Sequence, residues 1–137
     1  MKKHHTKNKG DLGALKAQAD VCSQGYTILI PLTEHAPFDF VAYKDNKFLR
    51  IQAKYRSVVK GAITVQFRSS WSDKFGPHVT PTDKSEIDMF CIYCPETDKC
   101  YYLNPDKFHK SVTLRIEESK NSQKSKVHLA ENYRKID

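Results

Sequence analysis

The chain has 137 residues, and its 23 Lys and Arg against 16 Asp and Glu give a formal net charge of +7 at pH 7. This length supports one domain with a single modest core and excludes two. The basic excess favours a polyanionic partner such as nucleic acid, although charge alone fits a basic protein with a solvated surface equally well.

Membrane insertion and secretion are not expected. No run approaches the roughly 18 apolar residues of a membrane span, and residues 1–11 lack the apolar region of a secretory signal. We therefore expect a cytoplasmic, intracellular protein with no membrane partner and with reduced thiols at its four cysteines. Cys91, Cys94, Cys100 and His109 could be combined into a zinc site. However, residues three apart in a strand face opposite ways, so core cysteines are the better interpretation.

The first predicted element is a helix over residues 7–24. Thr6 can cap its start, and Gly25 stands where a helix would end. Its apolar residues recur at three- to four-residue spacing and are predicted to face the core: Leu12, Leu15, Ala19 and Cys22. A buried strand over residues 26–32 is predicted to follow.

Residues 38–56 have the pattern of two strands joined by the polar turn KDNK. Successive side chains of a strand point to opposite faces. In the second strand this places four apolar or aromatic residues on one face, namely Leu49, Ile51, Ala53 and Tyr55. The other face carries Arg50, Gln52, Lys54 and Arg56. One face is predicted to pack in the core and the other to carry polar chemistry.

The remaining elements follow from similar patterns. Residues 62–68 alternate as a strand, with Ile63, Val65 and Phe67 on one face and Thr64, Gln66 and Arg68 on the other. Residues 69–85 are predicted to be a long functional loop, 86–94 and 99–105 a hairpin, 104–109 a short helix begun by Asn104 and Pro105, and 111–117 an edge strand. From about residue 118 a polar tail is predicted to be mobile or ordered only by a partner. This order predicts one domain, 1–137, with an α/β (α+β) fold around a mixed sheet.

Three polar residues on the predicted strand pair indicate chemistry. Asp39 and the Gln52-x-Lys54 motif are brought together by a tight hairpin. Asp39 and the backbone carbonyl of Ala53 could supply oxygen to a hard cation such as magnesium, and Lys54 could place positive charge beside a phosphate. Individually, Asp39 could cap a turn, Gln52 could bond across strands and Lys54 could be solvated. Together they cost desolvation unless a metal with phosphate is their partner.

The stretches "PFD" and "IQAK" resemble the PD-(D/E)xK nuclease superfamily, with Gln52 standing where most members have Asp or Glu. Residues 6–26 resemble the first helix of its Holliday-junction resolvase and intron-encoded branches, and residues 85–108 resemble the closing strands of the latter. Within the superfamily, the chain resembles the cyanobacterial group I intron-encoded homing endonucleases. The resemblance implies a restriction-endonuclease-like mixed β-sheet flanked by helices. It also implies a site-specific double-strand DNA endonuclease that uses Mg²⁺ or Mn²⁺, with Gln52 in the metal shell.

One departure concerns Ala14, which stands where the relatives usually carry a glutamate in a pattern like G-D-L-G-E. Ala14 therefore belongs to the catalytic set by position, and an inactivating substitution explains it better than a natural alanine. Losing a unit charge near a divalent ion forfeits on the order of 4 kcal/mol before dehydration offsets it. This predicts little or no cleavage by this chain. A Holliday-junction resolvase-like protein or a catalytically silent DNA-binding protein is the alternative.

Candidate DNA contacts fall into two groups. Thr64, Gln66 and Arg68 could lie in the major groove as a β-ribbon, with Gln66 suited to adenine and Arg68 to guanine. Trp71 could stack or wedge, or could anchor the predicted loop to the core. The phosphate contacts are predicted to be Arg50, Arg56, Lys60, Lys74 and His78. For each lysine the alternative is a solvated side chain.

A 15.8 kDa domain covers too little DNA to specify a unique genomic site. Cutting both strands also requires two sites of opposite polarity, which a two-fold dimer on a pseudo-palindromic target supplies. The resemblance goes further and implies a homotetramer, a dimer of dimers. The segments "MFCIYC" and "CYYL" and the carboxy-terminal tail are the predicted interface candidates.

Overall fold

The computed structural model describes residues 5–117 and 127–136, with only the backbone described for residues 5–7 and 69–71. The described elements, in chain order, are α1 (His5–Ser23), β1 (Thr27–Leu29), β2 (Phe40–Lys44), β3 (Lys47–Tyr55), β4 (Ala62–Gln66), β5 (Arg68–Asp73), β6 (Gly76–Pro81), a 3₁₀ turn η1 (Lys84–Glu86), β7 (Met89–Cys94), β8 (Lys99–Leu103), η2 (Pro105–Lys107), β9 (Ser111–Arg115), β10 (His128–Leu129) and η3 (Ala130–Tyr133).

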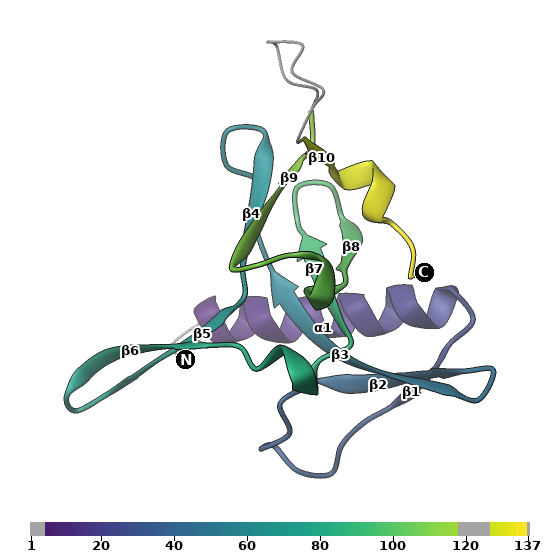
Figure 1. Ribbon diagram of the computed structural model, residues 1–137, viewed down its shortest axis with the longest axis horizontal. Coiled ribbons are helices and arrows are strands. Elements are labelled where there is room, and N and C mark those ends of the chain that lie inside the picture. The colour runs from purple at the N-terminus through teal and green to yellow at the C-terminus, as the bar shows by residue number, and fades with distance from the viewer. Residues whose placement is uncertain (1–4, 118–126, 137) are drawn as a thin grey trace.

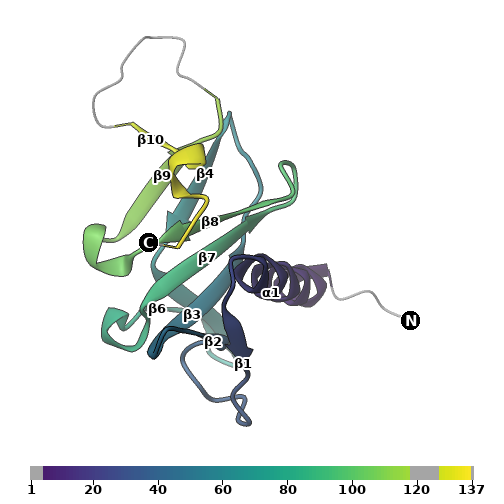
Figure 2. The ribbon, with the colours of Figure 1, turned by 90° about the vertical axis from the view of Figure 1, so that its right-hand side faces the viewer.

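The main sheet has five strands in the order β1-β2-β3-β7-β8. The sheet is mixed, because β3 and β7 pair in parallel while the other three strand pairs are antiparallel. Helix α1 lies across one face, and a second sheet of order β10-β9-β4 lies on the other (Figures 1 and 2). The predicted fold class is confirmed. In the described residues one α-helix flanks the sheet, and the second sheet covers the face opposite it.

Two hydrophobic clusters hold these layers together. One contains Ala17 and Val21 of α1 with Ile51 of β3, and the other contains Phe90 of β7 with Leu114 of β9. Successive residues of β7 alternate between the two clusters, so all six residues of the strand are buried. Residues 100–103 of β8 are buried too. The prediction that "MFCIYC" and "CYYL" form an interface is therefore wrong, because both segments lie inside the monomer.

Cys91, Cys94 and Cys100 are core cysteines as predicted, whereas Ala19 and Cys22, which were predicted to face the core from the first helix, are exposed. Cys91 belongs to the cluster under α1 and Cys94 to the cluster under the second sheet, so the two thiols lie on opposite faces of β7. Over the described part of the chain, no three His, Cys, Asp or Glu side chains gather to hold a metal.

Helix α1 forms where predicted but buries a different face. Leu12 and Leu15 are 41% and 63% exposed, while Ala17 and Val21 are fully buried. The reason is a close approach at Gly13, where an added Cβ would lie 3.2 Å from Cβ of Tyr55. Small residues allow the helix to lie against β3, and leucines on that face would hold it away.

The helix ends are in part as predicted. Thr6, the expected cap, lies inside α1, which already includes His5. Gly25 does follow the helix end with φ +92°, a conformation that glycine adopts at little cost. The KDNK turn is confirmed as well, because Asp45 and Asn46 have φ values of 52° and 62°, as a two-residue hairpin turn requires.

Four other expectations are corrected. Residues 26–32 were expected to be a buried strand, but β1 is a short strand at the sheet edge. Residues 69–85 form not a loop but mainly the hairpin β5–β6, which projects from the body of the molecule (Figure 1). Strand β9 is central in its sheet rather than an edge. Part of the tail folds back without a partner, since Ala130 is buried; residues 118–126 lie outside the described residues.

Candidate active site

Strand β3 presents Gln52 and Lys54 on the face turned away from α1. Their register partners on β7 are Phe90 and Ile92, which belong to the cluster under the second sheet. The apolar residues of β3 belong to the cluster under α1. The predicted division of β3 into a core face and a polar face is confirmed, and strand alternation is its cause.

Asp39 lies beside β3 at the point where β2 begins. Its backbone N–H donates to the carbonyl of Ile51 at 2.9 Å, and its Oδ2 accepts from the backbone N–H of Ala53 at 2.7 Å. The Asp39 carboxylate thus accepts the hydrogen bond from β3 that the backbone of β2 would accept if that strand extended one pair further. In a strand the N–H and C=O of one residue point to the same side. The carbonyl of Ala53 is therefore directed to the same edge as Asp39.

Gln52 is held by one end of its amide. Its Nε2 donates to the carbonyl oxygen of Pro37 at 3.1 Å, while its Oε1 is buried without a hydrogen-bond partner in the described protein. Buried acceptors are usually satisfied, and leaving one unpaired costs about 1–3 kcal/mol. An unpaired amide oxygen on the strand whose edge carries the Asp39 carboxylate has the chemistry of a ligand for a hard cation.

Lys54 is strongly perturbed. Its pKa is lowered to about 8, mainly by burial and also by the positive charge of Arg56, while the negative charge of Asp39 opposes both effects. Its Nζ lies 5.7 Å from the centre of the Phe90 ring. Conversely, desolvation raises the pKa of Asp39, and the bond from Ala53 and the charge of Lys54 lower it. The carboxylate and the ammonium therefore sense each other within one site.

The residues present fit a hard divalent cation. The carboxylate of Asp39, the amide oxygen of Gln52 and the carbonyl of Ala53 are oxygen ligands of the kind that magnesium and manganese accept. Asp39 brings the only negative charge among these three, because Gln52 and Ala53 contribute neutral oxygens.

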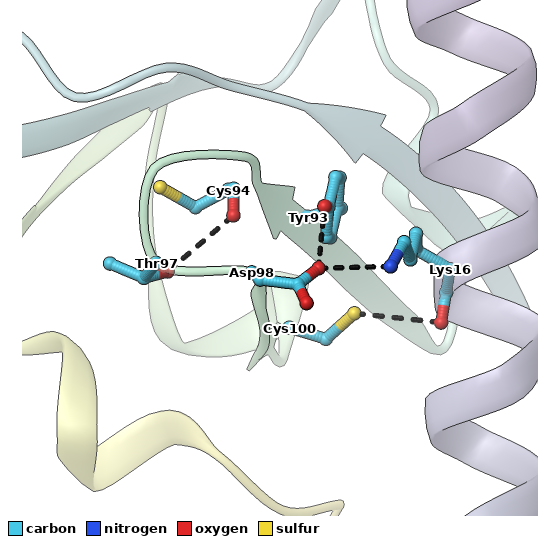
Figure 3. A network of polar contacts seen from close by, with 6 residues as sticks. All are labelled: Lys16, Tyr93, Cys94, Thr97, Asp98 and Cys100. Atoms are coloured by element: carbon cyan, nitrogen blue, oxygen red, sulfur yellow. Dashed lines mark hydrogen bonds and ion pairs between the residues drawn. The ribbon is translucent and has the colours of Figure 1, made fainter.

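The location of position 14 follows from the contacts that hold α1 against β3, β7 and β8. Lys16 bonds to Asp98 at 3.0 Å, Tyr93 donates to the same carboxylate at 2.7 Å, and Cys100 donates to the carbonyl of Lys16 at 3.7 Å (Figure 3). Three residues before Lys16, an added Cβ at Gly13 would lie 3.6 Å from the backbone carbon of Lys54. Ala14 follows Gly13 and is half-buried.

The candidate DNA contacts are not all on one surface. Thr64, Gln66 and Arg68 are exposed along β4 and the start of β5, as the alternation predicts. Lys74 is at the tip of the β5–β6 hairpin, and His78 on β6 bonds to Asp73 at 2.9 Å. The backbone of Trp71 pairs with that of His78 across the hairpin, but its side chain lies outside the described part. Lys60 lies in the turn before β4, at the end of that strand away from Arg68.

Arg50 is already engaged. Its Nε and Nη2 donate to the two carboxylate oxygens of Asp88 at 2.9 and 3.0 Å, and its backbone N–H donates to the same carboxylate. A phosphate would have to compete with Asp88, so the structure favours a role for Arg50 in the fold. Arg56 donates from Nη1 to the carbonyl of Tyr55 at 2.7 Å, and burial lowers its pKa.

Two partners of the site escaped the sequence reasoning. Pro37 orients Gln52 through a backbone carbonyl, which no side-chain pattern reveals. Phe90 lies below Lys54 and contacts Phe67, at 4.9 Å between ring centres, near the base of the β5–β6 hairpin. Only the pairing of β3 with β7 could have indicated it, and that pairing joins strands far apart in the sequence.

Strand β3 thus carries Gln52 and Lys54 on one face, with Asp39 at its edge, within a mixed sheet. The chain belongs to the PD-(D/E)XK endonuclease family, whose model matches residues 4–136. Its fold is similar to that of the bacterial homing endonuclease I-Ssp6803I, with a TM-score of 0.72, 22% sequence identity, and coverage of 94% of this chain and 88% of that one. The predicted family is confirmed. No curated protein matches the sequence. No helix in the described residues is long and apolar enough to cross a membrane.

Proposed function

We propose that this protein is a site-specific endonuclease of the homing type, which hydrolyses phosphodiester bonds of double-stranded DNA with Mg²⁺ or Mn²⁺. Family membership implies a DNA substrate. The observation that carries the proposal is the juxtaposition of Asp39 with the orphaned oxygen of Gln52 on a strand that also carries Lys54.

The roles of the residues follow from their chemistry. Asp39, Gln52 and the carbonyl of Ala53 would hold the cation, which when bound supplies electrostatic stabilisation of the reacting phosphate. Lys54 places its ammonium where negative charge develops on the phosphate oxygens. Its partial burial keeps water from screening that charge, which strengthens the interaction.

Ala14 affects how fast this chain could cleave DNA, not which reaction its family catalyses. The support is that the preceding residue, Gly13, approaches β3 so closely that an added Cβ would meet Lys54 and Tyr55. A glutamate there would add a second negative charge near the site. We infer that alanine weakens or abolishes cleavage, which makes a catalytically silent DNA-binding protein the second candidate function.

The DNA-facing surface is proposed to run along β4 and the β5–β6 hairpin. Thr64, Gln66 and Arg68 form its exposed strip, and Lys74 extends it to the hairpin tip. Phe67 joins this strip to the site, because its ring packs on Phe90 below Lys54. Arg56 and Lys60 are further candidate phosphate contacts, whereas Arg50 is better explained by its bond to Asp88.

The assembly is proposed to be a homo-oligomer, a tetramer built as a dimer of dimers on one pseudo-palindromic duplex. The support is the need for two sites of opposite polarity. Since "MFCIYC" and "CYYL" are buried, the contact surface must lie elsewhere on the chain.

Selection of duplexes from a random-sequence pool in EDTA tests the binding half of this proposal. We expect enrichment of one pseudo-palindromic sequence, bound by more than one chain in sedimentation. Recovery of unrelated sequences would contradict site specificity. One chain per duplex at saturation would contradict the oligomer, and a dimer would contradict only the tetramer.

A further inference from the structure

The tip of the β5–β6 hairpin carries an apolar side chain that is exposed to solvent. Phe75 is 80% exposed, and strands β5 and β6 pair with each other and with no other described strand. The hairpin projects from the body of the molecule (Figure 1). An isolated two-stranded hairpin gains little stability from its own contacts. Packing within the fold therefore does not explain a phenylalanine at this tip.

The turn that carries Phe75 is held by Asp73. The Oδ1 of Asp73 accepts from the backbone N–H of Phe75 at 2.8 Å, and the same oxygen lies 2.9 Å from Nε2 of His78. Gly76 completes the turn with a φ of +115°, in a range that other residues rarely adopt. An aspartate at the first position and a glycine at the fourth are typical of such a turn. The backbone of Phe75 is thus positioned before a partner binds, which lowers the entropic cost of binding.

The surroundings of Phe75 favour DNA over a protein as its partner. The Nζ of Lys74 lies 5.0 Å from the centre of the Phe75 ring, so a cation accompanies the ring. Val79 is 56% exposed and lies two residues before Pro81, the pairing partner of Arg68, so Val79 and Arg68 share one face of the hairpin. A protein interface needs a wider patch that is depleted of charge at its centre. A single exposed ring with cations beside it suits bases flanked by phosphates.

We propose that Phe75 inserts its ring between two neighbouring base pairs of the target and kinks the duplex at that step. The inference rests on the proposed function and deepens it, because it assigns a residue to the choice of target. Contact with a groove edge would leave much of the ring in water, whereas insertion buries both of its faces. Unstacking costs least at pyrimidine–purine steps, so the ring selects such a step without a hydrogen bond to any base.

The length of the hairpin determines where the inserted ring acts. Strand β5 has six residues, so the tip lies roughly 20 Å from the base of the hairpin, which corresponds to about six base pairs of duplex. Arg68 begins β5 at that base and is the proposed contact to guanine. Each half-site should therefore contain a pyrimidine–purine step within about six base pairs of that guanine.

The test uses the full chain and a duplex that the wild type selects from a random-sequence pool in EDTA. Energy transfer between dyes at the two ends of the duplex reports its bend. We expect Phe75→Ala to lose most of the bend and to bind about tenfold more weakly, because the inserted ring is lost. Phe75→Leu keeps an apolar side chain and should keep the bend. Phe48→Ala is the matched control, since Phe48 is 61% exposed but lies near the β2–β3 turn, and it should behave as the wild type.

A single nick moved along the duplex locates the kink. A nick at the unstacked step removes part of the cost of kinking, so it should tighten binding of the wild type by at least about tenfold and leave Phe75→Ala unchanged. Equal bends with the wild type and Phe75→Ala, or no step at which a nick favours the wild type, would overturn the inference. Dissociation of the DNA-free oligomer by Phe75→Ala, with the bend unchanged, would assign the ring to a protein contact and overturn it as well. A protein that selects no duplex would overturn the proposed function itself, so the two failures are distinguishable.

Discussion

The Nε2 of Gln52 donates a hydrogen bond to the carbonyl oxygen of Pro37 at 3.1 Å, which leaves Oε1 of the same amide buried and unpaired. The amide nitrogen of Gln52 thus has a hydrogen-bond partner within the fold, whereas its amide oxygen has none in the described residues. A buried acceptor without a hydrogen bond lowers stability, because its desolvation is not compensated. Gln52 is therefore not explained by a role in stability alone.

The first prediction concerns this residue. Gln52→Met has nearly the same shape and removes the orphaned oxygen, and Pro37 is exposed enough to bond water instead. We expect the variant to be as stable as the wild type or more stable by about 1 kcal/mol. Calcium should at the same time bind the protein–DNA complex of the variant more weakly than that of the wild type, because one oxygen ligand is lost. Urea unfolding measures the first effect, and a loss of stability above about 1 kcal/mol would show that Gln52 is a structural residue.

The second prediction uses two glycines of α1. An added Cβ at Gly10 meets nothing within 4 Å, whereas one at Gly13 would lie 3.2 Å from Cβ of Tyr55. Gly10→Ala should therefore stabilise by up to about 1 kcal/mol through helix propensity. Gly13→Ala should destabilise, because Tyr55 is fixed in β3 and cannot yield. Equal gains in thermal unfolding of both variants would contradict the close approach that places Ala14.

The third prediction concerns pH. The pKa of Lys54 is lowered to about 8 in the folded protein, from an unfolded value of 10.5. Between these values the unfolded chain binds more protons than the folded one, so stability should rise with pH. Lys54→Met should lack this rise. We expect the difference between the two proteins in urea unfolding to change by about 2 kcal/mol from pH 7.5 to 10.5, after allowance for partial solvent exposure. A constant difference would contradict a desolvated lysine.

The fourth prediction concerns the DNA face. Arg68→Gln should weaken binding to the selected duplex by about 1–3 kcal/mol and relax its sequence preference, because the proposed guanine contact is lost. Lys47→Gln is the matched control, since Lys47 is equally exposed but lies at the β2–β3 turn. Equal effects of the two substitutions would mean that general charge, rather than the β4–β5 strip, sets the affinity.

The parts of the fold that were predictable depend on local pattern. Strict alternation of polar and apolar residues in β3 and β4 predicted their inner and outer faces. The polar Asp45–Asn46 turn predicted the hairpin between β2 and β3. These signals come from side-chain period and backbone preference, which act over a few residues.

What the sequence concealed depends on distant partners. The buried face of α1 is set by Gly13 against Tyr55 rather than by its leucines, so the helical pattern pointed to the wrong side. None of the described side chains of the β5–β6 hairpin is buried, and the sequences of its strands lack apolar alternation. They include Pro77 and Pro81, which a strand with a free edge tolerates. The Asp39, Gln52 and Lys54 set was found from its spacing, but its orientation by Pro37 was not.

Whether this site hydrolyses DNA is tested most directly by sequencing the ends that Ala14→Glu leaves in a plasmid pool with random inserts. With magnesium we expect double-strand ends at one recurring sequence, and none in EDTA. Adding Asp39→Asn or Lys54→Ala should abolish the ends while DNA binding survives. An Ala14→Glu protein that binds its selected duplex tightly yet never cuts with magnesium or manganese would contradict the assignment of an endonuclease site at Asp39, Gln52 and Lys54.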